Sequence, residues 1–188
     1  LAAGLYADGV TAVSEPFASR DHTERMLEYF SADIKRNGLF TEIRGGKELT
    51  ARDIDVPGDI SSAAFFMVAG LIVKGSDIIL RNVGLNPTRR GIFDVLKRMG
   101  GYLEILDLKN NIEPIADIRV KYSELKCTRV EAAEIPLLID EVPILLVAAA
   151  KADGRTFIEG IGELKVKETD RVKSMTTNLS KMGVRLFS

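Results

Sequence analysis

The feature that most constrains the fold of this chain is an internal repeat. Three times, a glycine closes an apolar stretch, a short strand follows, and an amphipathic segment then runs to a second glycine. The first glycines are Gly9, Gly75 and Gly154, and the second are Gly38, Gly100 and Gly183, which follow after 29, 25 and 29 positions. Glycine at a helix end supplies the left-handed conformation at little cost, so its recurrence has a physical cause. The repeat predicts α/β units that share one layout.

The pattern also predicts where the repeated elements lie. A strand is expected after each second glycine, and the first two of these strands should continue into hairpins. Amphipathic helices are predicted over 20–38, 87–100 and 166–183, strands over 39–46, 102–109 and 184–188, and hairpin segments over 47–57 and 113–122.

Two further stretches, 59–75 and 135–154, have the composition of buried helices because they are apolar on most faces. Asp59 is a suitable N-cap for the first stretch. Pro143 lies inside the second and should either bend that helix or mark a later start. Such repeats with buried helices favour layered sheets around a helical interior.

Pro57 and Gly58 break the chain just before a new helix, which predicts one domain over 1–56 and another over 57–188. The chain begins without Met and ends in a strand-like stretch, so we expect both ends to be cut from a longer polypeptide. A net charge of −1 provides no global basic field for nucleic acid. The single cysteine, Cys127, excludes an internal disulfide and fits a reducing cytoplasm. The longest apolar run contains three charged residues, so we expect no membrane span.

The segment VKETDR, residues 166–171, is the first candidate for chemistry. We expect it to open a helix, which would put Lys167 and Arg171 on one helix face. Glu168 would lie beside these two cations near the positive helix start. Such a group can hold an anionic substrate and carry a proton. The plainer alternative is a solvated, charged helix start.

Asp140 is the second candidate because it stands among apolar residues in IPLLIDEVPILL. A buried aspartate is rare unless it is paired or functional. Burial would raise the pKa of this carboxyl and a nearby lysine would lower it, which is how the pKa of a general base is adjusted. The alternative is a solvent-facing carboxylate at a helix end, since Glu141 and Pro143 indicate an element boundary.

The third candidate is SRDHTER, residues 19–25. Arg20 precedes the first turn of a predicted helix, where it could hold a phosphate bidentately; the alternative is a cap with surface ion pairs. His22 is the single histidine, so we expect no metal site here. The sequence contains no GxGxxG, Walker or GxSxG motif.

Five segments together resemble the family of 5-enolpyruvylshikimate-3-phosphate (EPSP) synthases, in the spelling of its bacterial class II branch. They are SRDHTERM, VPGDISSAAFF, NPTRRGIFDVLKRMGG, IPLLIDEVPILLVAAAKADG and ELKVKETDRV. The resemblance implies an α/β fold of repeated βαβαββ units, the inside-out α/β barrel of the enolpyruvyl transferases, incomplete in this chain. By this resemblance residues 1–56 close the first, N-terminal domain, and 57–188 supply most of the second, C-terminal domain with two repeat units.

The family transfers the enolpyruvyl group of phosphoenolpyruvate to the 5-hydroxyl of shikimate 3-phosphate and releases phosphate. The resemblance implies that Asp140 contacts the 5-hydroxyl as a candidate base, that Glu168 handles the methylene proton, and that Lys167 touches both substrates. Which of the three moves which proton stays open. The implied substrate-binding set is Ser19, Arg20, Asp140, Glu163, Lys167 and Arg171, with Arg171 on phosphoenolpyruvate and Arg20 on shikimate 3-phosphate. No metal or organic cofactor is implied.

Several family elements that hold the substrates are absent, among them the Gly-Asn-Ala-Gly-Thr loop and the Ser-Ala-Gln group. We therefore expect this chain by itself to be inactive and to have the rest of the enzyme chain as its partner. The full-length enzyme is expected to be a cytoplasmic monomer that binds neither nucleic acid nor a membrane. The nearest alternative is UDP-N-acetylglucosamine enolpyruvyl transferase, which has the same fold and donor. A non-catalytic anion-binding fragment is the alternative from another class.

Overall fold

The computed structural model describes residues 1–186 and divides into two compact units. Unit 1 comprises Leu1–Val56 together with Asn110–Pro114. Unit 2 comprises Pro57–Lys109 and Ile115–Ser188. Each unit is described by itself below.

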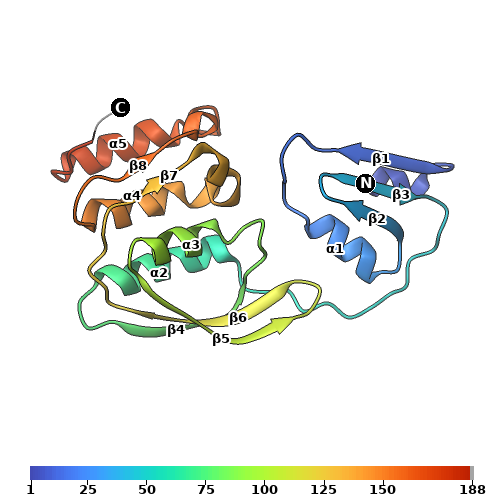
Figure 1. The fold of residues 1–188 in the computed structure, drawn as a ribbon, viewed down its shortest axis with the longest axis horizontal. Coiled ribbons are helices and arrows are strands. Elements are labelled where there is room, and N and C mark those ends of the chain that lie inside the picture. Colours follow the sequence, from blue (N-terminus) through green and yellow to red (C-terminus); the bar gives the residue numbers. More distant parts are fainter. Residues whose placement is uncertain (187–188) are drawn as a thin grey trace. The chain divides into compact units, whose positions relative to one another are not determined.

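Unit 1 is a three-stranded antiparallel sheet with one α-helix (Figure 1). The strands β1 (Val10–Ser14), β2 (Asp33–Asn37) and β3 (Phe40–Arg44) lie in the order β1-β3-β2. Helix α1 (His22–Tyr29) connects β1 to β2, and the 3₁₀ helix η1 (Ala2–Tyr6) contacts β3. The central strand, β3, therefore contacts both other strands and η1.

The predicted helix over 20–38 is wrong in its second half. Helix α1 ends at Tyr29, and residues 33–37 form β2, which pairs with β3 across the two-residue turn Gly38–Leu39. Gly38 has a φ of 58°, so it closes a hairpin rather than a helix. An Asn-Gly pair between two strand-like stretches is a strong hairpin signal, and the interpretation as a continuous helix overlooked it.

The larger sheet of unit 2 repeats this topology. Strands β4 (Asp77–Gly84), β5 (Tyr102–Asn110) and β6 (Pro114–Lys121) lie in the order β4-β6-β5, so the third strand is again central. Helix α3 (Gly91–Arg98) connects the first strand to the second, as α1 does in unit 1. The internal repeat predicted from the glycines is thus confirmed as a repeat of topology.

Two parallel βαβ crossings complete unit 2. Strands β7 (Arg129–Val130) and β8 (Phe157–Ile158) pair in parallel, with α4 (Val142–Lys151) between them along the chain. Helix α2 (Ile60–Ile72) occupies the same place between Gly58 and β4, and Gly58 bridges Val83 in parallel. Because each crossing leads into a strand and a further helix, the α/β units predicted from the sequence are present.

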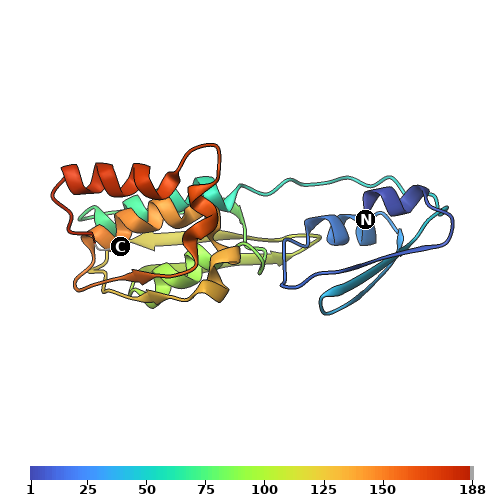
Figure 2. The same ribbon diagram turned by 90° about the horizontal axis from the view of Figure 1, so that it is seen from above.

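The helices of unit 2 lie in layers. Helices α2 and α3 cover one face of the β4-β6-β5 sheet, α4 contacts both of them, and α5 (Arg171–Lys181) lies beside α4 (Figures 1 and 2). The apolar composition of α2 and α4 agrees with this interior position. The largest side chains with almost no exposure include Met67, Leu71, Phe93, Ile118 and Leu145.

Local signals at the helix starts hold in most places. Asp59 caps α2, since its Oδ2 accepts a hydrogen bond from the backbone N–H of Ser62 at 2.9 Å. Pro143 lies in the first turn of α4, so it marks a later start, as one of the two expectations had it. The residues before it form two 3₁₀ helices, η2 (Ala132–Leu137) and η3 (Ile139–Glu141).

The repeated glycines behave largely as predicted. Gly9, Gly75 and Gly154 all have positive φ, at 94°, 82° and 94°, just before β1, β4 and β8. Gly100 and Gly183 follow α3 and α5 with φ of 88° and 86°. Five of the six positions therefore terminate or follow a helix in the left-handed region that glycine reaches most easily.

Other predicted boundaries need correction. The helix expected from 87 begins at Gly91, after a turn, and the helix expected from 166 begins at Arg171, because Asp170 caps it. Residues 47–57 contain no strand, and neither do residues 184–186. The last two positions of the predicted strand over 184–188 lie outside the described residues.

Candidate functional site

The N-terminal ends of α4 and α5 lie close together and gather three of the candidate side chains. Arg171, the first residue of α5, places Nη1 3.6 Å from Oδ1 of Asp140 and Nη2 3.0 Å from Oε2 of Glu168. The exposed fractions of these side chains are 29% for Arg171, 34% for Asp140 and 81% for Glu168. One guanidinium therefore bridges two carboxylates at a surface that solutes can reach.

Asp140 is presented by the short turn η3, immediately before α4. Leu138 before it and Val142 after it are each only 1% exposed, so both sides of the turn are held in the core. Asp140 itself points outward to Arg171. The structure thus favours the solvent-facing alternative for this aspartate, although its partner is an arginine from the next helix.

The buried carboxylate of this segment is Glu141, which the sequence did not single out. Its residue is 4% exposed, and its Oε1 accepts a hydrogen bond from the hydroxyl of Ser61 in α2. Burial raises the pKa of Glu141, whereas the Ser61 hydrogen bond and the charge of Arg89 act to lower it. The sequence signal for Glu141 was its position next to Asp140 inside an apolar run. Two successive residues of a helix point in different directions, so one of the two carboxylates could face the core while the other does not.

Arg89 extends this buried contact to the start of α2. Its Nη2 donates to the Ser61 hydroxyl at 2.7 Å and lies 3.1 Å from Oδ1 of Asp59. The same Asp59 caps α2 through its other oxygen. A continuous polar chain therefore runs from the cap of α2 through Arg89 and Ser61 to Glu141.

Lys167 lies in the loop before α5, and its partner is Glu163. The Nζ of Lys167 is 2.5 Å from Oε1 of Glu163, in the 3₁₀ helix η4 (Ile161–Lys165). The prediction that Lys167 and Arg171 share a helix face is wrong, because only Arg171 belongs to α5. Capping by Asp170 leaves the preceding residues free to turn away from the helix axis.

Glu168 is a charged, accessible carboxylate. Hydrogen bonds from its own backbone N–H and from Arg171, together with the arginine's charge, lower the pKa of its carboxyl. Glu168 is therefore ionised at neutral pH and accepts hydrogen bonds. A group in this state can take up a proton or hold a cationic partner, and it donates a proton only after gaining one.

Ser19 and Arg20 belong to unit 1 and precede α1. The hydroxyl of Ser19 donates to Oε1 of Glu15 at 2.5 Å, and Arg20 is exposed. These two residues are described within their own unit. The four candidates Asp140, Lys167, Glu168 and Arg171 all belong to unit 2.

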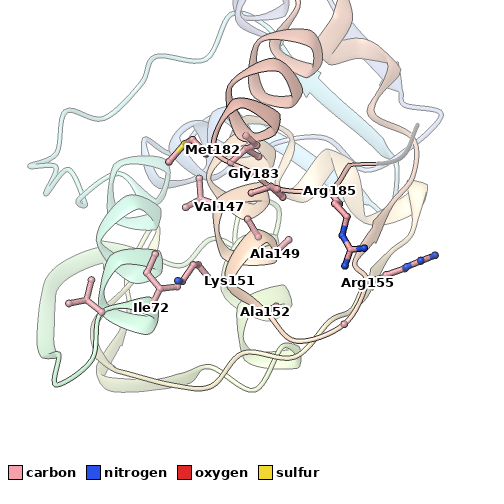
Figure 3. Close-up of a pocket in the computed structure, with 14 residues that line it drawn as sticks. Ile72, Val147, Ala149, Lys151, Ala152, Arg155, Met182, Gly183 and Arg185 are labelled. Atoms are coloured by element: carbon pink, nitrogen blue, oxygen red, sulfur yellow. The ribbon is translucent and has the colours of Figure 1, made fainter.

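A cavity of about 850 Å³ lies at the other ends of α4 and α5. Figure 3 shows Val147, Ala149 and Met182 along it, with Lys151 and Arg185 nearby. At about 1.5 Å of rise per residue, the opposite ends of α4 lie about 14 Å apart. The cavity is therefore separate from the Asp140–Arg171 cluster, and its lining combines apolar side chains with the cations Lys151, Arg155 and Arg185.

Among residues 1–186, no group of three or more His, Cys, Asp or Glu side chains is placed to hold a metal ion. Within the same residues, no helix has both the length and the apolar character to cross a membrane.

Comparison with known proteins identifies the family. The family described as EPSP synthase (3-phosphoshikimate 1-carboxyvinyltransferase) matches residues 1–187. The 3-phosphoshikimate 1-carboxyvinyltransferase of Geobacter metallireducens is 56% identical over 97% of this chain and 43% of its own length. The corresponding protein of Geotalea daltonii is 55% identical over 98% of the chain and 43% of its own length. The chain thus spans less than half the length of these curated relatives.

Solved structures agree in fold. An EPSP synthase from Acinetobacter baumannii superposes with a TM-score of 0.89 at 48% identity, over 95% of this chain and 40% of its own. The enolpyruvyl transferase NikO from Streptomyces tendae gives a TM-score of 0.63 at 21% identity, over 82% and 36%, which bears on the fold alone. The predicted α/β fold of the enolpyruvyl transferase type is confirmed, and within the described residues no closed barrel is formed. On the family match and these identities, the chain belongs to the EPSP synthase (3-phosphoshikimate 1-carboxyvinyltransferase) family.

Proposed function

We propose that this chain contributes part of the active site of an enzyme that transfers the enolpyruvyl group of phosphoenolpyruvate to the 5-hydroxyl of shikimate 3-phosphate, with release of phosphate. The observation that carries the proposal is the bridge from Arg171 to Asp140 and Glu168, in a member of the EPSP synthase family. The reaction needs a base for the hydroxyl, an acid for the methylene carbon, and cations for the phosphates. The cluster contains a cation and two carboxylates, of which Glu168 can serve as the acid once it has gained a proton.

The family resemblance implies a role for each side chain, and the environment of each side chain is compatible with that role. Asp140 is fixed at a turn with a partly exposed carboxylate, so it can approach the acceptor hydroxyl as a base. Arg171 is the cation at the start of α5, where the helix dipole also favours an anion such as the phosphate of phosphoenolpyruvate. Glu168 is ionised before substrate arrives, so it would first take up a proton from bulk water and deliver it to the methylene carbon. It would take a proton back from the resulting methyl group when the adduct eliminates phosphate.

Lys167 would bind both substrates after leaving Glu163, since its ion pair is short but lies on an accessible loop. Surface ion pairs of this kind are weak, so an incoming phosphate can replace the carboxylate. Ser19, Arg20 and Glu163 are proposed as substrate-binding residues because the family resemblance implies it, with Ser19 and Arg20 assigned to shikimate 3-phosphate. We assign residues 1–56 to the end of the first domain and 57–188 to most of the second.

The whole enzyme would need the rest of the polypeptide found in its relatives, because the chain spans 43% of the Geobacter metallireducens protein. We therefore expect these 188 residues alone to bind anions without turnover. We expect the complete protein to act as a monomer in the cytoplasm, and the single cysteine of these 188 residues, Cys127, fits such a reducing compartment.

A chimera tests this function. The 188 residues replace the matching segment of the Geobacter metallireducens relative, and phosphate release is followed with phosphoenolpyruvate and either shikimate 3-phosphate or UDP-N-acetylglucosamine. The expected result is turnover with shikimate 3-phosphate only, with the unaltered relative as control and no turnover by the 188 residues alone. A chimera that folds but releases no phosphate, or prefers the nucleotide sugar, would contradict the proposal.

A further inference from the structure

Hydrogen bonds between polar side chains connect the buried Glu141, next to Asp140, to Ser61 and to the partly exposed Arg89. No role in the proposed reaction explains these contacts. Glu141, at 4% exposure, accepts from the hydroxyl of Ser61, and Ser61 accepts from Arg89 at 2.7 Å. A buried carboxylate is costly unless its hydrogen bonds and charge are compensated. Its presence beside Asp140 therefore indicates a role other than packing.

The direction of each hydrogen bond is fixed by chemistry. The guanidinium of Arg89 can only donate, so the oxygen of Ser61 accepts from it and the Ser61 hydroxyl is directed to Glu141. The Glu141 oxygen must therefore accept, which a carboxylate does best. The hydrogen bonds consequently all run in one direction, from Arg89 to Ser61 and from Ser61 to Glu141, the residue next to Asp140. We call this set of contacts the relay.

The relay ties three elements together. Asp59 caps α2 and also pairs with Arg89 at 3.1 Å. Ser61 lies in the first turn of α2, and Glu141 is the last residue of η3 and the N-cap position of α4. These contacts therefore fix the position of the η3 turn relative to the first turn of helix α2.

We propose that Glu141 is a positioning residue, which through Ser61 and Arg89 holds the η3 turn so that Asp140 faces Arg171. This inference rests on the proposed function, because it assigns Glu141 a part in presenting the base of that reaction. Glu141 is fully enclosed, so it acts through Asp140 and does not touch substrate. Loss of the relay would let the turn drift, and misplacement by about 1 Å can reduce a rate by roughly 100-fold.

The first experiment uses the 188-residue chain and does not depend on catalysis. Amide hydrogen exchange is measured across the turn, where the N–H of Glu141 bonds to the carbonyl of Leu138 at 3.0 Å. In Ser61→Ala and Glu141→Gln we expect exchange at these amides to quicken by roughly tenfold or more, because local opening becomes easier. Ser61→Thr keeps the hydroxyl and should restore near-native exchange. Unchanged exchange in Ser61→Ala would overturn the proposal.

The second experiment uses the chimera. Glu141→Gln and Ser61→Ala should lower kcat by roughly 10- to 100-fold while the KM for phosphoenolpyruvate changes little, since misplacement of the base affects the chemical step. Asp117→Asn is the matched control, because Asp117 is also a largely buried carboxylate of unit 2 but binds Arg81 and the backbone of Asn82. It should leave kcat within about twofold, as expected for a substitution without contact to the site.

The outcomes separate the two proposals. An unsubstituted chimera without turnover contradicts the proposed function, while altered exchange in Ser61→Ala would still support the positioning of the turn. An active chimera whose kcat is unaffected by Glu141→Gln and Ser61→Ala overturns the positioning role alone. An equal loss of kcat in Asp117→Asn overturns it too, because the effect would then be general destabilisation.

Discussion

The close approach of α3 to η2 allows a sharp test of how the Asp140 turn is supported. Gly91, the first residue of α3, lies so near Leu137 that an added Cβ would be 2.9 Å from the carbonyl carbon, the carbonyl oxygen and the Cβ of that leucine. Ordinary van der Waals contact begins near 3.4 Å. Gly91→Ala therefore forces a separation of about half an ångström, and backbone atoms cannot rotate out of the way as a side chain could.

The expected effect on stability follows from two opposing terms. Overpacking a core contact costs about 1–3 kcal/mol, and the helix preference of alanine over glycine returns at most about 1 kcal/mol, with less at a first turn. The net loss is about 1–2 kcal/mol of unfolding free energy, which lowers Tm by roughly 2–8 °C for a chain of this size. Because Leu137 stands three residues before Asp140, the shift should also lower the kcat of the chimera about tenfold.

Urea and thermal unfolding followed by circular dichroism measure the stability, and phosphate release by the chimera measures the rate. Gly162→Ala is the matched control, since nothing lies within 4 Å of a Cβ at that position. It should change neither Tm by more than about 2 °C nor kcat. If Gly91→Ala were as stable as the parent and equally active, the tight contact between α3 and η2 would not support the turn.

Four further outcomes are expected. Leu145→Ala should lower the free energy of unfolding by about 3–5 kcal/mol, because Leu145 is fully buried in α4. Leu108→Ala, at a half-exposed position, should lower it by well under about 1 kcal/mol. Urea unfolding measures both variants. Asp59→Ala should lose about 1 kcal/mol through the lost cap of α2, measured in the same way. Arg171→Gln should lower kcat of the chimera by roughly 100-fold or more with a small change in Tm, since its ion pairs are accessible. Burial raises the pKa of Glu141 in the folded state above its unfolded-state pKa of about 4.3. Glu141 therefore contributes stability below the unfolded-state pKa, and this contribution is lost as the pH rises through the folded-state pKa. Glu141→Gln should remove this pH dependence, so the unfolding free energy should fall less over that pH range.

The repeat was predictable because its signals are local. A positive φ before β1, β4 and β8 is easily adopted only by glycine, so the spacing of the glycines predicts where these strands begin. The capping of α2 by Asp59 was predictable for the same reason, since a cap is formed within a few residues. The sequence could not show that the third strand of each sheet lies in the middle, because strand order depends on contacts between distant residues.

Helix starts and ends were predicted less well where two local signals compete. The segment 30–37 has helical composition, but the Asn-Gly pair and pairing with β3 make residues 33–37 a strand. In the same way, the cap at Asp170 begins α5 at Arg171 and leaves Lys167 in a loop with Glu163. In both cases a short-range preference for helix is overridden by hydrogen bonds that satisfy the backbone in another way.

The sequence left open whether Asp140 is buried or faces solvent, and it did not single out Glu141 as the buried carboxylate. Successive residues at a helix start point about 100° apart, so in an apolar run with two adjacent carboxylates one can enter the core while the other lies at its margin. Which of the two is buried depends on where the neighbouring helix supplies a donor, and here Ser61 of α2 supplies it to Glu141. Anchoring of Glu141 thus leaves Asp140 partly exposed beside Arg171, and a substitution that loosens the anchor should change the stability of the turn and the rate of the reaction together.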